Sequence, residues 1–367
     1  MGNDRRIGVR GWLLAFSAAV CSHTLSRVGD AGAALVRTRP SPRPGSLLLR
    51  SAACIAVVLL ARIATADALL YVSNLASNGS WEILRYDSTT GAFAGRFATL
   101  AGDCQGLTAG PDGTIYAANF NNRRVDRYDG VSGAFMGTFA SFGSPYSGVY
   151  GVAFGPDGNL YVGMSGGDVM KVNGTTGASL GRFVAAPSGV FDFGGLAFRG
   201  NSLFVTYGGT SGKMYRYDAT TGGNAQLVYG GFSSNGPRTP SFDAAGNVYV
   251  PDWQTTKVYK FDGSTLALSG TIVNSPSISP VALGFGGTGN LLVLSENGGN
   301  STIRGFLSNT GSSVGTLVQS GSGGLYRGFA MATVTPVPEV DPAACGSALA
   351  LVAGALAMLE RRRGRRA

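Results

Sequence analysis

The chain repeats a unit of about 44 residues, and this periodicity constrains its fold more than any other feature. The clearest copy spans residues 104–139 and reads CQGLTAGPDGTIYAANFNNRRVDRYDGVSGAFMGTF. Apolar and polar residues alternate there in short runs separated by turn sequences, which predicts four antiparallel strands. The expected strands cover residues 107–109, 115–117, 125–129 and 134–139. A lone sheet of this size cannot bury both faces, so the units are expected to pack against one another.

A basic–aromatic–acidic triplet marks the expected third strand of each unit. Its copies, some degenerate, are Arg85-Tyr86-Asp87, Arg127-Tyr128-Asp129, Lys171-Val172-Asn173, Arg216-Tyr217-Asp218, Lys260-Phe261-Asp262 and Arg304-Gly305-Phe306. Their middle residues lie 42, 44, 45, 44 and 44 residues apart. This spacing is too long for leucine-rich or helical solenoid repeats and is typical of propeller blades.

A first-strand sequence recurs five times, which is one copy fewer than the triplet. The copies begin at Gly106, Gly151, Gly195, Pro240 and Ala282. The sixth is expected in Arg327–Met331, which has no second strand after it, whereas Leu69–Asn74 resembles a second strand with no first strand before it. Pairing these two segments closes the ring and leaves no open edge. We therefore expect an all-β fold: a six-bladed β-propeller of four-stranded antiparallel blades, closed by its N- and C-terminal strands.

These repeats resemble the NHL-repeat family of propellers. The match is closest in Gly106–Asp129 and Gly151–Asn173, where the sequence GVAFGPDGNLYVG fits the family pattern position by position. It covers about 265 residues and weakens from the third blade on, where Gly200-Asn201 replaces the Pro-Asp-Gly turn. The resemblance implies the propeller fold and a binding or scaffolding role. Because that family also includes enzymes, reaction chemistry needs evidence of its own.

Residues 1–66 are expected to be a targeting region. They contain nine arginines and two aspartates. Residues 50–66, with the apolar run Ala52–Leu60, predict a secretory signal cleaved after Ala66 or Ala68. A buried helix of the folded domain is the alternative. A second apolar segment, residues 11–20, stands ahead of this signal, so we hypothesise that translation starts near Val36.

Residues 335–367 form a second expected targeting region with three parts. These are a motif with Val337, Pro338 and Glu339, an apolar stretch over residues 343–359, and a cluster with Arg361, Arg362 and Arg363. Seventeen apolar residues are at the lower limit for a transmembrane helix, and the arginines would stay on the cytoplasmic side.

This tail resembles the bacterial PEP-CTERM sorting signal, although Val340 replaces the second proline of the motif. The resemblance implies an exosortase-type protease as a partner. It also implies an exported protein at the cell surface or outside the cell, held in the membrane transiently or permanently by its C-terminal helix. A plain C-terminal membrane anchor is the alternative. The propeller itself is expected to span residues 67–334.

Charge separates the two ends from the repeats. The whole chain carries a formal charge of +9, but residues 67–336 contain 15 Lys or Arg and 15 Asp or Glu. The repeats are therefore neutral, and they lack the basic stripe with interleaved aromatics that nucleic-acid binding needs. No nucleic-acid partner is expected.

Cysteine and histidine limit the chemistry of the repeats. Only Cys104 lies in the expected propeller, and the single histidine, His23, lies outside it. With no histidine to activate it, Cys104 is expected to be a half-buried structural thiol, so no catalytic residue, cofactor or metal is predicted. Aspartates recur in turns at Asp87, Asp112, Asp129, Asp157, Asp218, Asp243 and Asp262. Because none shows the spacing of a calcium loop, each is expected to bond its own backbone.

The loops between second and third strands, and those between blades, are expected to share one face of the ring. The candidate ligand-binding residues there are Trp81, Asn119, Tyr146, Tyr150, Phe191, Arg238, Asp252 and Trp253. Exposed aromatics of this kind stack on sugars or hold peptides, whereas buried ones wedge between blades.

The function predicted from these features is an exported, surface-sorted, non-catalytic binding or scaffolding module for a glycan or protein ligand, in an extracellular polysaccharide matrix. One alternative is a hydrolase or lyase that uses channel-mouth carboxylates such as Asp252 or Glu296. Another is a structural surface protein without a specific ligand.

Overall fold

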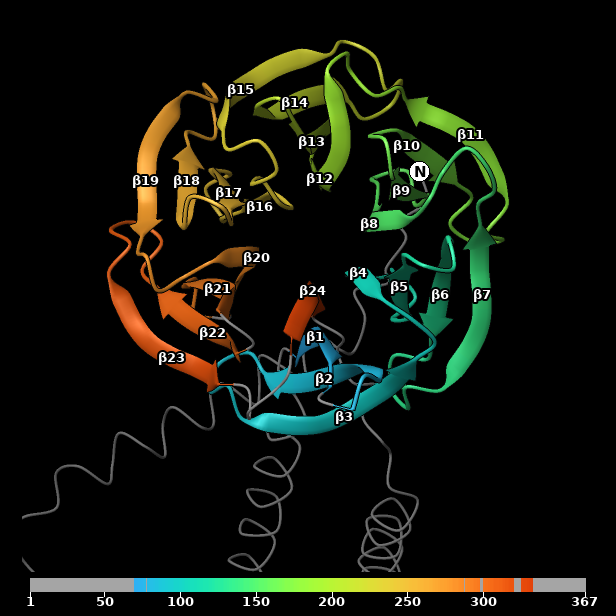
Figure 1. The fold of residues 1–367 in the computed structure, drawn as a ribbon, viewed down its shortest axis with the longest axis horizontal. Helices are drawn as coiled ribbons and strands as arrows, with labels where there is room; N and C mark the ends of the chain where they lie inside the picture. The colour runs from blue at the N-terminus through green and yellow to red at the C-terminus, as the bar shows by residue number, and fades with distance from the viewer. Residues whose placement is uncertain (1–68, 77, 287, 298–299, 320–324, 333–367) are drawn as a thin grey trace, which may run out of the picture. The chain divides into compact units, whose positions relative to one another are not determined.

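The computed structural model describes residues 69–332, apart from 77, 287, 298–299 and 320–324. The regular structure in this part of the chain consists of β-strands, which form six antiparallel sheets of four strands each. The sheets are arranged around a central axis as the blades of a β-propeller (Figure 1). The predictions of fold class and blade number are thus confirmed.

The first three blades are given from the innermost strand to the outermost. Blade 1 contains β24 (Leu325–Ala332), β1 (Leu69–Leu75), β2 (Trp81–Asp87) and β3 (Phe93–Leu100). Blade 2 contains β4 (Cys104–Ala109), β5 (Ile115–Asn119), β6 (Arg124–Tyr128) and β7 (Phe135–Ser141). Blade 3 contains β8 (Val149–Phe154), β9 (Leu160–Met164), β10 (Val169–Val172) and β11 (Ser179–Val184).

The other three blades follow the same order. Blade 4 contains β12 (Val190–Arg199), β13 (Ser202–Gly209), β14 (Gly212–Asp218) and β15 (Gln226–Phe232). Blade 5 contains β16 (Ser241–Phe242), β17 (Val248–Asp252), β18 (Lys257–Phe261) and β19 (Leu268–Asn274). Blade 6 contains β20 (Pro280–Phe285), β21 (Leu291–Asn297), β22 (Asn300–Phe306) and β23 (Ser313–Gln319).

Blade 1 closes the ring in the expected way. Its inner strand β24 comes from the far end of the repeats and pairs with β1, so that Leu69 lies opposite Ala332. Leu69 also lies opposite Asp87, the last residue of β2. Both ends of the propeller chain therefore lie at the end of the ring that carries the turns between third and fourth strands. We call this end the lower face and the opposite end the loop face.

The apolar core lies between blades rather than inside them. Along β5, Ile115 and Ala117 pack into the cluster shared with blade 1, whereas Tyr116 and Ala118 pack into the cluster shared with blade 3. Successive side chains of a strand point to opposite faces, so one short strand serves two interfaces. Six such clusters join the six blades in a ring. The expectation that the units pack against one another is confirmed.

In five of the six triplets the last residue, an aspartate or Asn173, organises the turn that follows it. Asp129 Oδ1 accepts hydrogen bonds from the backbone nitrogen of Ser132 at 2.8 Å and from its hydroxyl at 2.7 Å. These bonds hold the pKa of the Asp129 carboxyl below its ordinary value. The same pattern recurs at Asp87, Asn173, Asp218 and Asp262. The predicted backbone-bonding role of these turn residues is confirmed.

The same turns also join neighbouring blades. Arg85 Nη1 donates to the carbonyl oxygen of Val131 in the blade 2 turn at 3.5 Å, and Tyr71 donates to that of Gly130 at 3.4 Å. In blade 5, Lys260 and Tyr249 both donate to the carbonyl oxygen of Ser308 in blade 6. In blades 1 and 5 the basic member of the triplet thus bridges to the next blade, whereas Lys171 in blade 3 pairs with Asp157 of its own blade.

The expected targeting segments, residues 1–66 and 335–367, lie outside the described residues, and so do the sorting-motif residues Val337, Pro338, Glu339, Arg361, Arg362 and Arg363. Among the residues that the structure does describe, no helix has the length and apolarity needed to cross a bilayer.

Candidate functional site

The structure brings the eight candidate ligand-binding residues to the loop face. They occupy strand ends and connections at that end of the ring: Trp81 begins β2, Asn119 ends β5, Tyr146 precedes β8, Tyr150 is in β8, Phe191 is in β12, Arg238 precedes β16, Asp252 ends β17 and Trp253 follows it. They nevertheless differ in what they do there, because several are committed to contacts within the scaffold.

Asn119 and Asp252 hold loops together. Asn119 is buried and donates from Nδ2 to Asp126 Oδ2 at 3.0 Å. Asp252 is fully buried and accepts hydrogen bonds from the backbone nitrogen and the hydroxyl of Ser233, which clasp the loop between blades 4 and 5. A carboxylate buried in this way cannot meet a substrate at the channel mouth.

Tyr146, Trp81 and Phe191 are not among the residues that line the cavity on the ring axis. The Tyr146 hydroxyl donates to Asp168 Oδ2 at 2.8 Å, and burial together with this bond raises the pKa of Tyr146 to about 12. Trp81 is half-buried against the cluster between blades 1 and 2. Phe191 stands on the loop face with 65% of its surface exposed.

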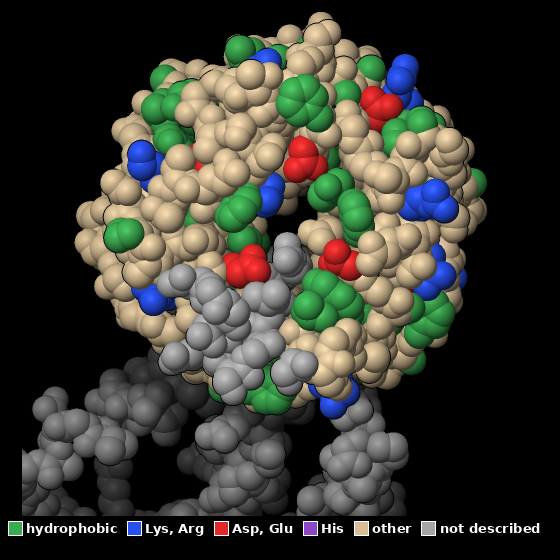
Figure 2. Space-filling view, in the orientation of Figure 1, with side chains coloured by type: hydrophobic (Ala, Val, Ile, Leu, Met, Phe, Trp, Pro, Cys, Tyr) green, Lys and Arg blue, Asp and Glu red, His purple; other side chains and the backbone are tan. Residues whose placement is uncertain are grey.

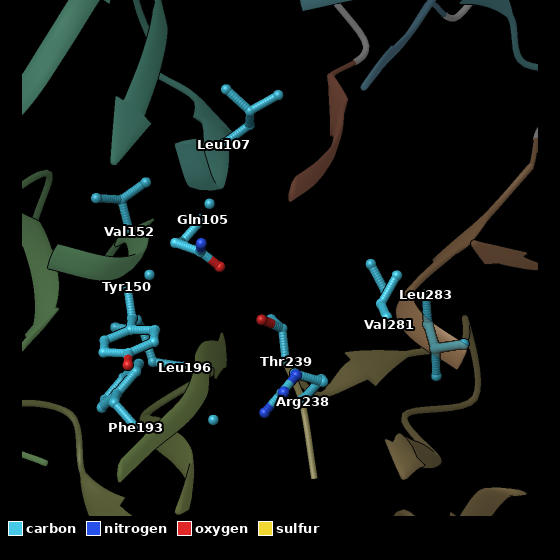
Figure 3. A pocket seen from close by; sticks show the side chains of 14 residues that line it. Gln105, Leu107, Tyr150, Val152, Phe193, Leu196, Arg238, Thr239, Val281 and Leu283 are labelled. Atoms are coloured by element: carbon cyan, nitrogen blue, oxygen red, sulfur yellow. The ribbon is translucent and has the colours of Figure 1, made fainter. Parts of the chain in front are cut away.

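Tyr150 and Arg238 meet at a cavity of about 100 Å³ on the ring axis (Figure 3). The cavity is lined by the innermost strands β4, β8, β12 and β20 and by the residues just before β16. Its apolar wall includes Leu107, Val152, Leu196 and Leu283. Its polar groups come from Gln105, Tyr150, Arg238 and Thr239. The cavity is therefore an apolar channel with a polar mouth.

The polar mouth combines charges of both signs. Burial, followed by the charge of Asp192 and a hydrogen bond to it, raises the pKa of Tyr150 to about 12, so the phenol stays neutral and donates to that carboxylate. The nearby Arg238 charge acts in the opposite direction on Tyr150. On the neighbouring blade, Gln105 Nε2 donates to Asp103 Oδ2 at 2.8 Å. Figure 2 shows acidic and basic side chains around the central opening.

Trp253 acts through Arg238. The Arg238 guanidinium lies 5.5 Å from the centre of the Trp253 ring, which is cation–π contact. Both side chains donate to the carbonyl oxygen of Asn235, Arg238 at 3.1 Å and Trp253 at 2.7 Å. Trp253 is not among the residues that line the cavity. It positions the arginine that does.

The sequence analysis missed Gln105 and Thr239, although a pattern in the repeats marks them. The residue immediately before the recurring first-strand sequence lines the channel in five blades: Gln105, Tyr150, Gly194, Thr239 and Val281. First strands are innermost, so the residue at their entrance faces the axis. Only the aromatic member of this series was singled out from the sequence, because the others are chemically unremarkable.

Cys104 is completely buried rather than half-buried. Burial raises the pKa of its thiol to about 12, and Sγ contacts the carbonyl oxygen of Gly106 at 3.4 Å. A thiol of this kind is protonated at neutral pH and inaccessible to substrate. Within the described part of the chain, no three His, Cys, Asp or Glu side chains are grouped so as to hold a metal ion.

No family model and no curated protein sequence matches the chain. Among solved structures, a chain of the nidogen/laminin complex is similar with a TM-score of 0.57 and 14% identity, over 72% of this chain and 98% of that one. A protein of unknown function from Bacteroides caccae is similar with a TM-score of 0.54 and 16% identity, over 72% and 98% of the two chains. At these identities the likeness shows the propeller fold alone.

Proposed function

We propose that the chain is an exported, surface-sorted propeller of the NHL-repeat type that acts as a non-catalytic binding module. Its ligand, a glycan or a protein, would bind at the mouth of the central channel on the loop face. The observation that carries this proposal is the convergence of four polar side chains from three blades on one cavity: Gln105 of blade 2, Tyr150 of blade 3, and Arg238 and Thr239 of blade 5.

The chemistry of this mouth suits a ligand rich in hydroxyl or amide groups. Arg238 and Gln105 supply donors, whereas Asp103 and Asp192 supply acceptors at the rim. Because the mouth has both donors and acceptors beside an apolar wall, a polyhydroxyl ring or a peptide group can satisfy both.

Several side chains considered for catalysis are held in the scaffold. Asp252 and Cys104 are buried. The rim carboxylates of Asp192 and Asp103 already accept hydrogen bonds from Tyr150 and Gln105. This arrangement favours binding over general acid or base chemistry.

The experiment is a glycan and peptide array probed with the full-length protein, followed by titration of any hit. Arg238→Ala and Trp253→Ala should both lose saturable binding. The first removes the guanidinium that donates to the ligand, and the second removes the ring that holds this guanidinium in place. Phe191→Ala is the matched control, because this exposed aromatic on the same face lies outside the cavity. Equal loss in all three variants would contradict a site at the channel mouth.

A panel of lactones and esters separates this proposal from its rivals. Turnover by the protein would replace the binding module with a hydrolase or lyase. If the protein shows neither turnover nor saturable binding, the structural surface protein becomes the better interpretation.

Export and sorting are proposed from the two tails. An exosortase-type protease would cut near Glu339, and the C-terminal apolar segment would hold the protein in the membrane before that step. The test is the intact mass and terminal peptides of protein recovered from its cell envelope or medium. A product from about Asp67 or Leu69 to about Glu339 supports sorting, whereas a C-terminus at Ala367 indicates a plain anchor.

A further inference from the structure

Each blade exposes an apolar side chain at the start of its outermost strand. These residues are Phe93, Phe135, Leu180, Leu227, Leu268 and Val314, with exposed fractions between 43% and 61%. They are the first or second residues of β3, β7, β11, β15, β19 and β23. We call this set the apolar belt. Scattered exposed apolar residues are ordinary, but here every blade has one within the first two residues of its outermost strand, so they recur around the ring.

The belt lies toward the lower face. Each outermost strand begins directly after the turn between the third and fourth strands, and those turns define that face. Leu69 and Ala332 lie at the same end, because they pair with each other and Leu69 also pairs with Asp87. The chain thus enters and leaves the propeller on the side that carries the belt.

The sequence beyond Ala332 brings a membrane to this side. Only ten residues, 333–342, separate Ala332 from the apolar segment 343–359 that is proposed to enter the bilayer. Ten residues span at most about 35 Å, so the lower face of an anchored propeller stays close to the lipid surface. A short tether also gives a high effective concentration, so weak apolar contacts suffice for docking.

We propose that the apolar belt docks the propeller, lower face down, on the surface of the membrane that holds its tail. This inference rests on the membrane anchor of the proposed function. Docking in this orientation directs the loop face, with its channel mouth, away from the bilayer. The ring would thereby present its binding site to ligands outside the cell.

Three observations favour lipid over a protein partner. A plane can touch all six blades at once, as the distribution of the belt requires. Two copies anchored in one membrane have lower faces that point the same way, so they cannot meet face to face. In addition, the pairing of third and fourth strands is irregular in every blade, and such bulges discourage the addition of a strand from a partner.

Charge further defines the lipid chemistry. Lower-face turns carry Asp87, Asp129, Asp218 and Asp262, whose carboxyl pKa values are all held below the ordinary range, so these groups are ionised at neutral pH. They offset the neighbouring basic members of the triplets. Docking should therefore need apolar insertion into a zwitterionic surface rather than attraction to anionic lipid.

The experiment places a fluorophore on the belt of the full-length, membrane-inserted protein. Phe135→Cys is labelled with an environment-sensitive dye after Cys21, Cys54 and Cys345 are replaced by serine, while the buried Cys104 is retained. The vesicles are phosphatidylcholine with nitroxide-labelled acyl chains. Phe191→Cys is the matched control, because Phe191 is 65% exposed but lies on the loop face.

Docking predicts that the dye at position 135 loses most of its emission to the nitroxide lipid and that the dye at position 191 does not. The quenching should persist at about 1 M NaCl, where the Debye length is only about 3 Å. A second dye position, Leu268→Cys, tests the contribution of the other belt residues. Emission from this dye should be quenched in the otherwise unchanged protein and should recover when Phe93→Ser and Phe135→Ser are added. These substitutions remove ring contacts with the buried Tyr86 and Tyr128, so thermal unfolding must show that the variant is folded before its emission is compared.

Three results would overturn the inference. The first is flotation of the protein with vesicles without quenching at position 135, which leaves the anchor and the proposed function standing. The second is equal quenching at positions 135 and 191, which means that the ring has no fixed orientation. The third is shielding of position 135 by dimers in detergent, which assigns the belt to a second copy. Failure of the full-length protein to float would instead refute the anchor on which the inference rests.

Discussion

Replacing Gly133 with alanine tests the close contact between blades at the lower face. Gly133 closes the turn after Asp129 with a φ of +73°, a conformation that L-residues adopt at a cost. A Cβ added here would overlap the carbonyl oxygen of Phe97 in the outermost strand of blade 1. Equivalent turn glycines at Gly91, Gly177, Gly222 and Gly311 would meet the carbonyl of the preceding blade in the same way. The contact is therefore a repeated joint of the ring.

Two terms contribute to the expected loss of stability. A left-handed φ costs an alanine about 1 kcal/mol. Overpacking against a fixed carbonyl costs a further amount of about 2 kcal/mol. Gly133→Ala should thus lower the free energy of unfolding by about 3 kcal/mol. The carbonyl belongs to a paired strand, so it cannot retreat without disturbing blade 1.

Gly113→Ala provides the control within the same blade. Gly113 has a φ of +79°, but no atom lies within 4 Å of its would-be Cβ. Only the conformational cost of about 1 kcal/mol applies there. Thermal unfolding of the two variants and the parent should separate Gly133→Ala from Gly113→Ala by roughly 4–8 °C. If the two variants have the same melting temperature, the neighbouring blade moves to make room for the added Cβ, and the contact is not tight.

Three further predictions follow from buried or paired groups. Hydrogen bonds from Lys171 and Asn159 outweigh burial and lower the pKa of Asp157 to about 2. The stability that this carboxylate contributes is present above a pH of about 4 and is lost as the pH falls toward about 2. The melting temperature of Asp157→Asn should therefore fall less steeply than that of the parent protein over this pH range. Equal slopes for the two proteins would contradict this. Asp252→Ala leaves the backbone nitrogen and hydroxyl of Ser233 without their acceptor. The free energy of unfolding, measured with denaturant, should fall by about 2 kcal/mol. An unchanged value would mean that these hydrogen bonds do not stabilise the loop. Cys104, whose thiol pKa is raised to about 12 by burial, should resist a thiol reagent at pH 8 until denaturant is added, as peptide mapping would show; rapid labelling of the native protein would contradict its burial.

Much of the fold was predictable from local sequence. The triplet Arg127-Tyr128-Asp129 combines a buried ring at Tyr128 with a turn cap at Asp129, so its recurrence reports blade number directly. The closure of the ring was also predictable, because Leu69–Asn74 and Arg327–Met331 each lacked a partner within their own repeat. Repeat folds allow this since each blade contacts only its neighbours, and local pattern then determines global arrangement.

The candidate site was predictable only in part. Loop lengths and strand order indicated that Tyr150, Arg238 and Trp253 share a face. The same reasoning placed Asp252 and Asn119 with them, yet both are buried and hold loops together. An aspartate at a strand end looks the same in sequence whether it faces solvent or a neighbouring backbone. Its role depends on what the adjacent loop supplies, here Ser233 from 19 residues away.

By itself, the sequence determined the six blades, their turns and the closure of the ring, because these depend on strand alternation, turn residues and contacts between successive repeats. Only the tertiary structure decided which loop-face side chains meet at the channel and that the exposed apolar residues form a belt on the face where the chain enters and leaves. Both results require residues from many blades to be placed around one axis. No single repeat contains that information, since the positions arise from the closed ring.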